Sequence, residues 1–488
     1  MPLVLVLQRV LARRDIGSLL VTLAICLVAG ALAGALVAFA TPLYAAALVV
    51  GVAAALLMLR SPDFTLMVTV AVIYLLPFGT LPLNVGFSPT FLNLALGMLF
   101  LVWAARIATG RQGRWVSSPI SAFVAIFALA TVGAFAAGLG HAQLTATALR
   151  QFAEIPLGIM IFFAVLNLVR TRRQVQQLTT WLILGGALAG AIGIVLYFLP
   201  PATSTRLLSA LGIFRYPSGP DVLRYIEDDP SLPQRAISTS VDPNVLGALM
   251  ALTLGLATPH LFERRPFIPR LWLLAAAASA GVCLFLTYSR GSLAGLAVGV
   301  IAILSLIGRY RKALLALALV ALLLLLLPQT QAYVAHFEQG VQGQDRATQM
   351  RFGEYKDALI LIQRYPWLGV GFVDAPDIDL YVGVSNLYLM ITEETGVIGL
   401  AAYLVTLALF YIITWIAWRH GRADPTLAPW IIGPAVSITA GLAGGVFDHT
   451  LFSFSHMLTL FWLIIGLGIV TAKLVEGAAE GARKVRDA

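Results

Sequence analysis

Long apolar runs separated by short polar connections follow one another along most of the chain, and this pattern predicts a polytopic integral membrane protein. A run of about 18 apolar residues can cross the hydrocarbon core of a bilayer as a helix, which satisfies its own backbone hydrogen bonds. We therefore expect an all-α fold with about fourteen transmembrane helices, or about twelve to fourteen if the shortest runs are re-entrant. The predicted spans are Ile16–Ala40, Leu43–Leu59, Phe64–Phe78, Phe91–Ile107, Pro119–Leu139, Phe152–Val169, Leu178–Leu199, Asn244–Phe262, Leu271–Thr287, Ser292–Ile307, Ala313–Leu327, Asn386–Trp418, Trp430–Val446 and Phe452–Ala472.

The two longest polar intervals divide these helices and predict the domain organisation. Residues 1–328 are expected to hold the N-terminal transmembrane helices, with an external loop at about 200–242. Residues 329–385 form the longest interval that hydrocarbon cannot accommodate, and we expect an extracytoplasmic loop there. Within it, Arg346–Gln363 carries apolar residues at helical spacing, which predicts an amphipathic helix on the membrane surface. Residues 386–488 would complete the fold with C-terminal transmembrane helices and a short cytoplasmic tail.

The composition agrees with a membrane protein, since 59% of residues are hydrophobic and 11% are charged, against about 25% charged residues in soluble proteins. The net charge of +9 is concentrated in short loops that fall on one side of the membrane when the N-terminus is inside. Short loops rich in Arg and Lys stay in the cytoplasm, so both termini are expected there. The basic balance thus reports topology and argues against a nucleic-acid partner. The basic clusters are Arg111/Arg114, Arg170/Arg172/Arg173, Arg264/Arg265/Arg270, Arg309/Arg311/Lys312, Arg419/Arg422 and Lys473/Arg483/Lys484/Arg486.

Several arginines depart from this rule, because they fall at outward span ends or in the outward loops. Arg290 lies in Tyr288-Ser289-Arg290-Gly291 between two spans, Arg215 lies in the first outward loop, and Arg351 lies in the predicted amphipathic helix, where Tyr355 is its neighbour. A guanidinium holds phosphate oxygens through paired hydrogen bonds, so these side chains are candidates for binding an anionic group at the outer leaflet. Solvated charge on an external loop, or snorkelling toward lipid headgroups, is the alternative interpretation.

Polar residues at the outward mouths of two other spans complete the candidate site. Asp242-Pro243-Asn244 precedes one span, where Asp242 is either a helix cap or a substrate contact. Ser385-Asn386 precedes another span, which contains Glu394 inside an apolar run. An acid at such a position is costly unless it is paired or faces a cavity, so an arginine is the partner expected for Glu394. Gly396 and Gly399 follow it and permit close helix packing.

The order and predicted placement of these motifs resemble the O-antigen ligase and O-antigen polymerase superfamily of bacterial envelope enzymes. The likeness covers most of the chain in architecture. Family ligases carry a His followed by Asn, Ser or Gln, then nine residues and Gly-x-x-Gly. This chain has the same spacing from Asn386 to Gly396 and Gly399, but Ser385 stands at the histidine position. The motifs are Asp242-Pro243-Asn244, Tyr288-Ser289-Arg290-Gly291, Arg351 ahead of Tyr365-Pro366-Trp367-Leu368-Gly369-Val370-Gly371, and Asn386–Gly399.

The resemblance implies a membrane glycosyltransferase that needs no metal and no cofactor, with its active site at the outer face of the bacterial cytoplasmic membrane. Such an enzyme takes a glycan from undecaprenyl pyrophosphate and transfers it to a hydroxyl of an acceptor sugar, either a glycan or a lipid A-type acceptor. Because a serine does not act as a base near neutral pH as a histidine does, Ser385 favours a polymerase over a ligase. Membrane lipids and an envelope-biosynthesis complex are the other partners expected.

In this interpretation, Arg290 and Arg351 offset the charge that develops on the pyrophosphate leaving group. The base that activates the acceptor hydroxyl is left open among His336, His449, Glu393, Glu394 and Asp448. The predicted site comprises catalytic Arg290, Arg351, Glu394 and His449, and substrate-binding Asp242, Asn244, Arg215, Tyr355, Ser385 and Asn386.

Two other functional classes account for part of the pattern. A transporter, either a lipid-linked glycan flippase or a small-anion permease, shares the span count. Transporters place ionisable groups near the bilayer midplane and often show internal repeats, whereas the ionisable groups here gather at outer span ends. A non-catalytic scaffold of an envelope polysaccharide complex is the second alternative, and a measurement of activity separates it from an enzyme.

Overall fold

The computed structural model describes residues 42–81, 88–141, 143–263, 266–307, 311, 314, 346–372, 383–421 and 428–487. The chain divides into two units, Met1–Ser61 and Pro62–Ala488. The described part of the first unit is the apolar helix α3 (Pro42–Arg60) and Ser61. The second unit holds every other element described below.

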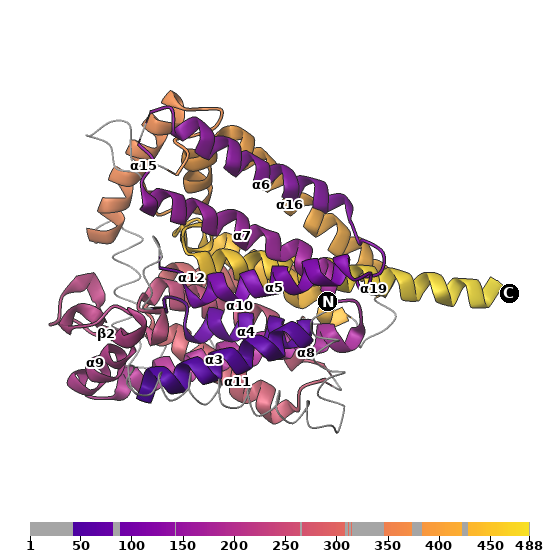
Figure 1. Ribbon diagram of the computed structural model, residues 1–488, viewed down its shortest axis with the longest axis horizontal. Coiled ribbons are helices and arrows are strands. Elements are labelled where there is room, and N and C mark those ends of the chain that lie inside the picture. The colour runs from indigo at the N-terminus through magenta and orange to yellow at the C-terminus, as the bar shows by residue number, and fades with distance from the viewer. Residues whose placement is uncertain are drawn as a thin grey trace, which may run out of the picture. The chain divides into compact units, whose positions relative to one another are not determined.

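The second unit is built mainly of helices, and residues 201–242 lie at the same end of these helices as α15 (Arg346–Arg364) (Figure 1). Seven of the described helices are long and apolar enough to cross a membrane, and five shorter apolar helices accompany them. The protein is therefore an all-α, multi-pass membrane protein. The helices are α4 (Pro62–Leu75), α5 (Phe91–Ala108), α6 (Pro119–Gly138), α7 (Ala146–Leu168), α8 (Arg172–Phe198), α9 (Pro201–Ala210), α10 (Pro243–Leu261), α11 (Arg270–Leu286), α12 (Arg290–Ser305), α15 (Arg346–Arg364), α16 (Leu387–Gly421), α17 (Ala428–Gly444), α18 (Thr450–Ser453) and α19 (Ser455–Asp487).

Each predicted span that falls in the described residues overlaps a helix, although Phe452–Ala472 is divided between α18 and α19. Ile16–Ala40 and, except for Leu314, Ala313–Leu327 lie outside the described residues. The helices α7 and α8 begin earlier than predicted, because Thr145 and Thr171 cap them ahead of the apolar stretch. Each threonine side chain accepts a hydrogen bond from a backbone N–H of the first turn, which lets a polar segment start a helix. The predicted amphipathic helix is present as α15.

The segment predicted as an external loop at about 200–242 contains more regular structure than expected. It begins with α9 and continues with the short 3-10 helices η1 (Leu211–Phe214), η2 (Pro220–Val222), η3 (Ile226–Asp228) and η4 (Ser238–Ser240). The strands β1 (Arg224–Tyr225) and β2 (Gln234–Arg235) pair antiparallel, with Arg224 opposite Arg235. Alternation of apolar and polar residues is too short to read in strands of two residues, so the sequence did not reveal this ribbon.

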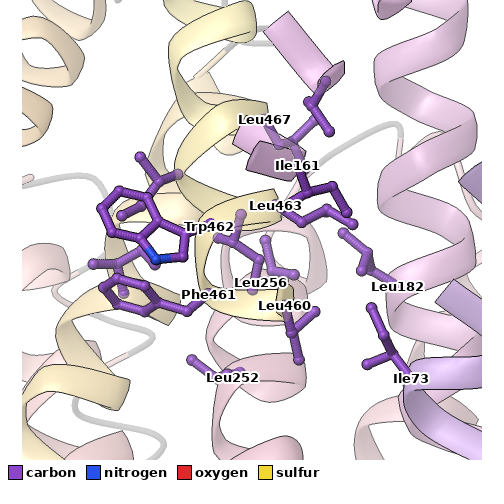
Figure 2. Close-up of a cluster of buried hydrophobic side chains, with 14 of the residues drawn as sticks. Ile73, Ile161, Leu182, Leu252, Leu256, Leu460, Phe461, Trp462, Leu463 and Leu467 are labelled. Atoms are coloured by element: carbon purple, nitrogen blue, oxygen red, sulfur yellow. The ribbon is translucent and has the colours of Figure 1, made fainter. Parts of the chain in front are cut away.

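The core is centred on α19, whose side chains from Met457 to Val475 are almost all buried (Figure 2). In its most apolar window 89% of residues are buried, against 33% for α5. A helix that is apolar on all sides and buried on all sides lies inside a bundle, whereas α5 presents one side to the surroundings. Trp462 packs there against Phe127 of α6 and Tyr403 of α16, with ring centroids 5.8 and 6.4 Å away.

A row of glycines brings α12 and α17 close together. Gly291, Gly295 and Gly299 recur every fourth residue and so share one face of α12. A Cβ atom at Gly295 would overlap the backbone of Ala440 and Gly444 in α17. Small residues at this spacing let helix backbones approach closely in a membrane. This contact fixes the N-terminus of α12 beside the C-terminus of α17, where the candidate site lies.

Candidate active site

A cavity of about 400 Å³ lies where residues 226–235 meet the ends of α10, α12 and α17 and the side of α15. Its volume is within the usual range for a ligand pocket. The charged side chains that line it are Arg235, Arg290, Arg351, Glu227 and Asp448. We call this space the arginine cavity. Three guanidinium groups against two carboxylates, among the described lining residues, give it a net positive charge that favours an anionic ligand.

Arg290 enters the cavity as the first residue of α12. The turn before it places Tyr288 in the left-handed region, with φ of 53°, which is unusual for a residue with a bulky side chain. Ser289 is held there by hydrogen bonds from its N–H to Thr287 Oγ1, at 3.2 Å, and between its hydroxyl and that of Ser292, at 2.9 Å. Burial raises the pKa of Tyr288, another residue lining the cavity, to about 12, so its hydroxyl stays protonated.

Arg351 and Tyr355 reach the same cavity from α15. The helix is tied to the segment before α16, because Glu354 Oε2 accepts a hydrogen bond from the Ser385 N–H at 2.9 Å. The Tyr355 hydroxyl donates to the Ser385 carbonyl at 3.4 Å. The structure thus brings Arg290 and Arg351, which are separated by a long stretch of sequence, to one cavity. This juxtaposition is what a shared phosphate ligand requires.

Arg235 is a third arginine of the cavity, although it was not among the predicted site residues. Its Nε donates to the Thr287 carbonyl at 2.8 Å, and its Nη2 donates to Asn244 Oδ1 at 2.7 Å. Strand β2 is anchored beside it, since the Ala236 N–H donates to the Leu286 carbonyl at 2.8 Å. Arg235 therefore connects the ribbon of β1 and β2 to the ends of α10 and α11, and it bonds to Asn244, which was predicted to bind substrate and also lines the cavity.

Asp448 lines the cavity just beyond the C-terminus of α17. Its Oδ1 accepts a hydrogen bond from the Thr450 N–H at 3.1 Å. Removal of the carboxylate from water raises its pKa, and the nearby Asp242 acts in the same direction, while His449 and Arg351 oppose the shift. The sequence suggested Asp448 as one of several bases, but only the fold reveals that it shares a cavity with the two arginines.

Two other predicted site residues, Asp242 and Asn386, are not among the described residues that line the cavity. Asp242 caps α10, because its Oδ1 accepts from the backbone N–H groups of Asn244 and Val245 at 2.8 and 2.9 Å. Asn386 similarly accepts from Tyr388 and Leu389 at the start of α16. Asp242 is thus a helix cap, one of the two roles expected for it, and Asn386 caps α16 in the same way.

Arg215 and His449, two further predicted site residues, make contacts elsewhere. Arg215 is exposed and donates a hydrogen bond to Ser88 in the loop before α5. The His449 Nδ1 atom lies 2.8 Å from the Ser453 hydroxyl. Neither side chain is among those that line the arginine cavity, and Ser385 joins it only indirectly through Tyr355. His336, a further candidate base, lies outside the described residues.

Glu394 occupies a different structure, which we call the glutamate junction: the contact of residues 366–372 with residues 393–397 of α16. The α16 backbone breaks at Gly396, whose φ of 66° and ψ of −175° are not helical. In a continuous helix the Val397 N–H would bond to the Glu393 carbonyl. Here it bonds to the Pro366 carbonyl at 2.8 Å, and the Glu393 carbonyl accepts instead from Val370, also at 2.8 Å.

The two glutamate side chains complete this junction. Glu394 is 6% exposed, and its Oε2 accepts from the Phe372 N–H at 2.7 Å, where the sequence suggested an arginine. Glu393 is 1% exposed, and its Oε1 accepts from the Gly383 N–H at 3.0 Å. Backbone N–H groups thus accompany both buried acids, which offsets part of the cost of burying them. Glu394 is not among the residues lining the arginine cavity, so the structure separates it from the arginines.

The comparison with protein families matches residues 274–404 to the family described as O-Antigen ligase. The matched segment runs from within α11 to within α16 and includes Arg290, Arg351 and the glutamate junction. Arg235, Asn244 and Asp448 lie outside it, although they line the same cavity. A search of curated proteins finds no match. Among the described residues, no group of three or more His, Cys, Asp or Glu side chains is arranged to hold a metal ion.

Proposed function

We propose that the protein is a membrane glycan enzyme of the O-antigen ligase and polymerase superfamily, whose family model matches residues 274–404, and that it elongates or transfers a lipid-linked glycan in the arginine cavity. The donor would be a glycan on undecaprenyl pyrophosphate at the outer face of the bacterial cytoplasmic membrane. The acceptor would be a sugar hydroxyl, on a second glycan or on a lipid A-type molecule. In this proposal residues 200–242 and 329–385 face outward and both termini face the cytoplasm.

The observation that carries this proposal is the meeting of Arg290 and Arg351 in one positively charged cavity. The reaction breaks the bond between the anomeric carbon and a pyrophosphate oxygen, so negative charge grows on the leaving group. Guanidinium groups already in place stabilise that charge without reorganising at the moment of reaction. Neither arginine has to move between separate sites, since α12 and α15 present both to the same space.

The position of Ser385 supports a polymerase more than a ligase. Family ligases carry a histidine there, and Ser385 instead uses its backbone N–H and carbonyl to hold α15 through Glu354 and Tyr355. A hydroxyl group does not accept a proton near neutral pH, so this position does not supply the ligase base. The polymerase proposal therefore requires a base elsewhere in the cavity.

Deletion of the gene tests the proposed function directly, with surface polysaccharide length measured on a gel. Loss of long chains, with single repeat units retained, is expected for a polymerase. Full-length chains left on the carrier lipid would identify a ligase instead. Normal polysaccharide would contradict both, and accumulation of donor on the cytoplasmic leaflet would favour a flippase. Complementation with Arg290→Ala or Arg351→Ala at wild-type protein levels separates the enzyme from a non-catalytic scaffold, because a scaffold would still complement.

A further inference from the structure

We propose that Asp448 is the general base that removes the proton from the acceptor hydroxyl. This inference rests on the proposed function and assigns a role that the missing ligase histidine leaves open. Of the candidate bases in the described residues, Asp448 lines the arginine cavity, while His449, Glu393 and Glu394 do not. A base has to reach the hydroxyl that attacks the carbon bonded to the leaving group, so it must share the space of the leaving-group arginines.

The local structure orients the Asp448 carboxylate through a hydrogen bond to one of its two oxygens. Its Oδ1 accepts the Thr450 N–H, and this contact between residues two apart fixes the carboxylate plane at the end of α17. Because the hydrogen bond that this side chain accepts among the described residues uses Oδ1, we assign the proton transfer to Oδ2. The close packing of α12 on α17 sets the position of this end, since a Cβ at Gly291 would lie 3.0 Å from the Cβ of Phe447.

The surrounding charges suit a base that alternates between ionised and protonated forms. The groups acting on Asp448 are Asp242 before α10, His449 on its own segment and Arg351 on α15, and Arg290 lines the same cavity. Burial and Asp242 favour the protonated carboxyl, so the pKa of Asp448 is raised despite the nearby cations. A raised pKa brings the carboxylate closer to the basicity that proton transfer near neutral pH requires.

The step balances as a single displacement. The acceptor O–H bond breaks and its proton passes to the Asp448 carboxylate, while the acceptor oxygen forms a bond to the anomeric carbon. The bond from that carbon to the pyrophosphate oxygen breaks, and its electron pair leaves with the undecaprenyl pyrophosphate. The arginines stabilise the oxygen that receives this pair. Asp448 then releases the proton to water, which restores the ionised base.

Asp448→Asn is the variant that tests this role, because the asparagine carbonyl can still accept the Thr450 N–H. The matched control is Asp229→Asn on the exposed outer loop, where Oδ1 accepts the N–H of Ser231 two residues later, at 2.8 Å. Glu227→Gln serves as the rival, because Glu227 is the second carboxylate of the cavity. The full-length protein in lipid nanodiscs would be assayed for transfer from its lipid-linked glycan donor and, separately, for binding of undecaprenyl pyrophosphate.

We expect Asp448→Asn to lower kcat by about 10²- to 10⁴-fold, the range for loss of a general base. Binding of undecaprenyl pyrophosphate should stay within about threefold of wild type, since the arginines are untouched. A wild-type rate that falls as pH decreases through the pKa of Asp448 should lose this dependence in the variant. Because that pKa is raised, the fall should occur at higher pH than for an ordinary aspartate.

Three results would overturn the assignment: Asp448→Asn transferring as fast as Asp229→Asn, Asp448→Asn losing carrier binding in parallel with turnover, or Glu227→Gln removing turnover in its place. Failure of the proposed function has a different signature. In that case the wild-type protein transfers no glycan, or Arg290→Ala and Arg351→Ala bind the carrier and transfer glycan as well as wild type.

Discussion

The arginine cavity and the glutamate junction both place acidic side chains at the ends of membrane helices, but they treat them differently. In the cavity, Asp448 lies with three guanidinium groups among the lining residues, and its Oδ1 accepts one hydrogen bond, from the Thr450 N–H. In the junction, Glu393 and Glu394 are nearly inaccessible and accept hydrogen bonds from backbone N–H groups. A buried acid in an apolar run is therefore not enough to indicate a catalytic residue. What separates the two cases is whether the residue lines a cavity or its carboxylate oxygens accept hydrogen bonds from backbone N–H groups.

This difference predicts that variants of the cavity lower activity at unchanged stability, whereas variants of the junction lower stability first. The largest effect is expected for Arg290→Ala and Arg351→Ala, which should each reduce glycan transfer by about 10²- to 10³-fold, as for loss of one transition-state donor. Transfer from the lipid-linked donor by purified protein measures it. Arg206→Ala is the control, because this arginine is exposed on α9 at the same end of the molecule. Equal activity in all three variants would remove the cavity from the mechanism.

Gly396→Ala should produce the largest loss of stability, about 3 kcal/mol. The substitution strains a residue with φ of 66° and drives a Cβ into the Trp367 carbonyl. The midpoint of thermal unfolding in detergent measures this change. Gly353→Ala in α15 is the matched control, since a Cβ there meets nothing within 4 Å and alanine favours a helix. A junction that tolerates Gly396→Ala as well as it tolerates the control would show that the break in α16 is not required.

Gly295→Ala tests whether the contact between α12 and α17 supports the cavity. The added Cβ would overlap α17 backbone, which cannot move aside as a flexible side chain can, so a loss of about 2 kcal/mol is expected. Because the two helices carry Arg290 and precede Asp448, transfer activity should fall as well. Unfolding midpoint and transfer rate are measured on the same preparation. Gly281→Ala in α11 provides the comparison, because its Cβ meets nothing within 4 Å; identical behaviour of both variants would contradict close packing.

Glu394 gives the smallest and most discriminating effect. Glu394→Gln keeps an oxygen for the Phe372 N–H and should change stability by less than about 1 kcal/mol, with glycan transfer preserved. Glu394→Ala leaves that buried N–H unpaired and should cost about 2 kcal/mol. Comparison of the two unfolding midpoints with the two transfer rates separates the roles. A Glu394→Gln protein that is as stable as wild type but transfers no glycan would show that Glu394 has a catalytic role.

The sequence alone determined the parts of this protein that depend on local pattern. Apolar runs long enough for a bilayer gave the spans, helical spacing gave α15, and the motif around Arg290 pointed to the family that residues 274–404 match. These features can be predicted because a helix forms its backbone hydrogen bonds within one segment, and its spacing of apolar residues can be read from a short stretch of sequence.

Only the tertiary structure decided which charged residues meet. Arg235 and Asp448 reach the cavity because a two-stranded ribbon and a glycine-mediated helix contact bring distant segments together. Glu394, which composition alone made a candidate, is instead satisfied by the N–H of Phe372. The reason is physical. The free-energy cost of burying a carboxylate in an apolar run means that it needs a partner, but the sequence does not show which group that partner is. The partner depends on where the helical backbone of α16 is interrupted and on which backbone N–H groups of other segments lie next to the interruption.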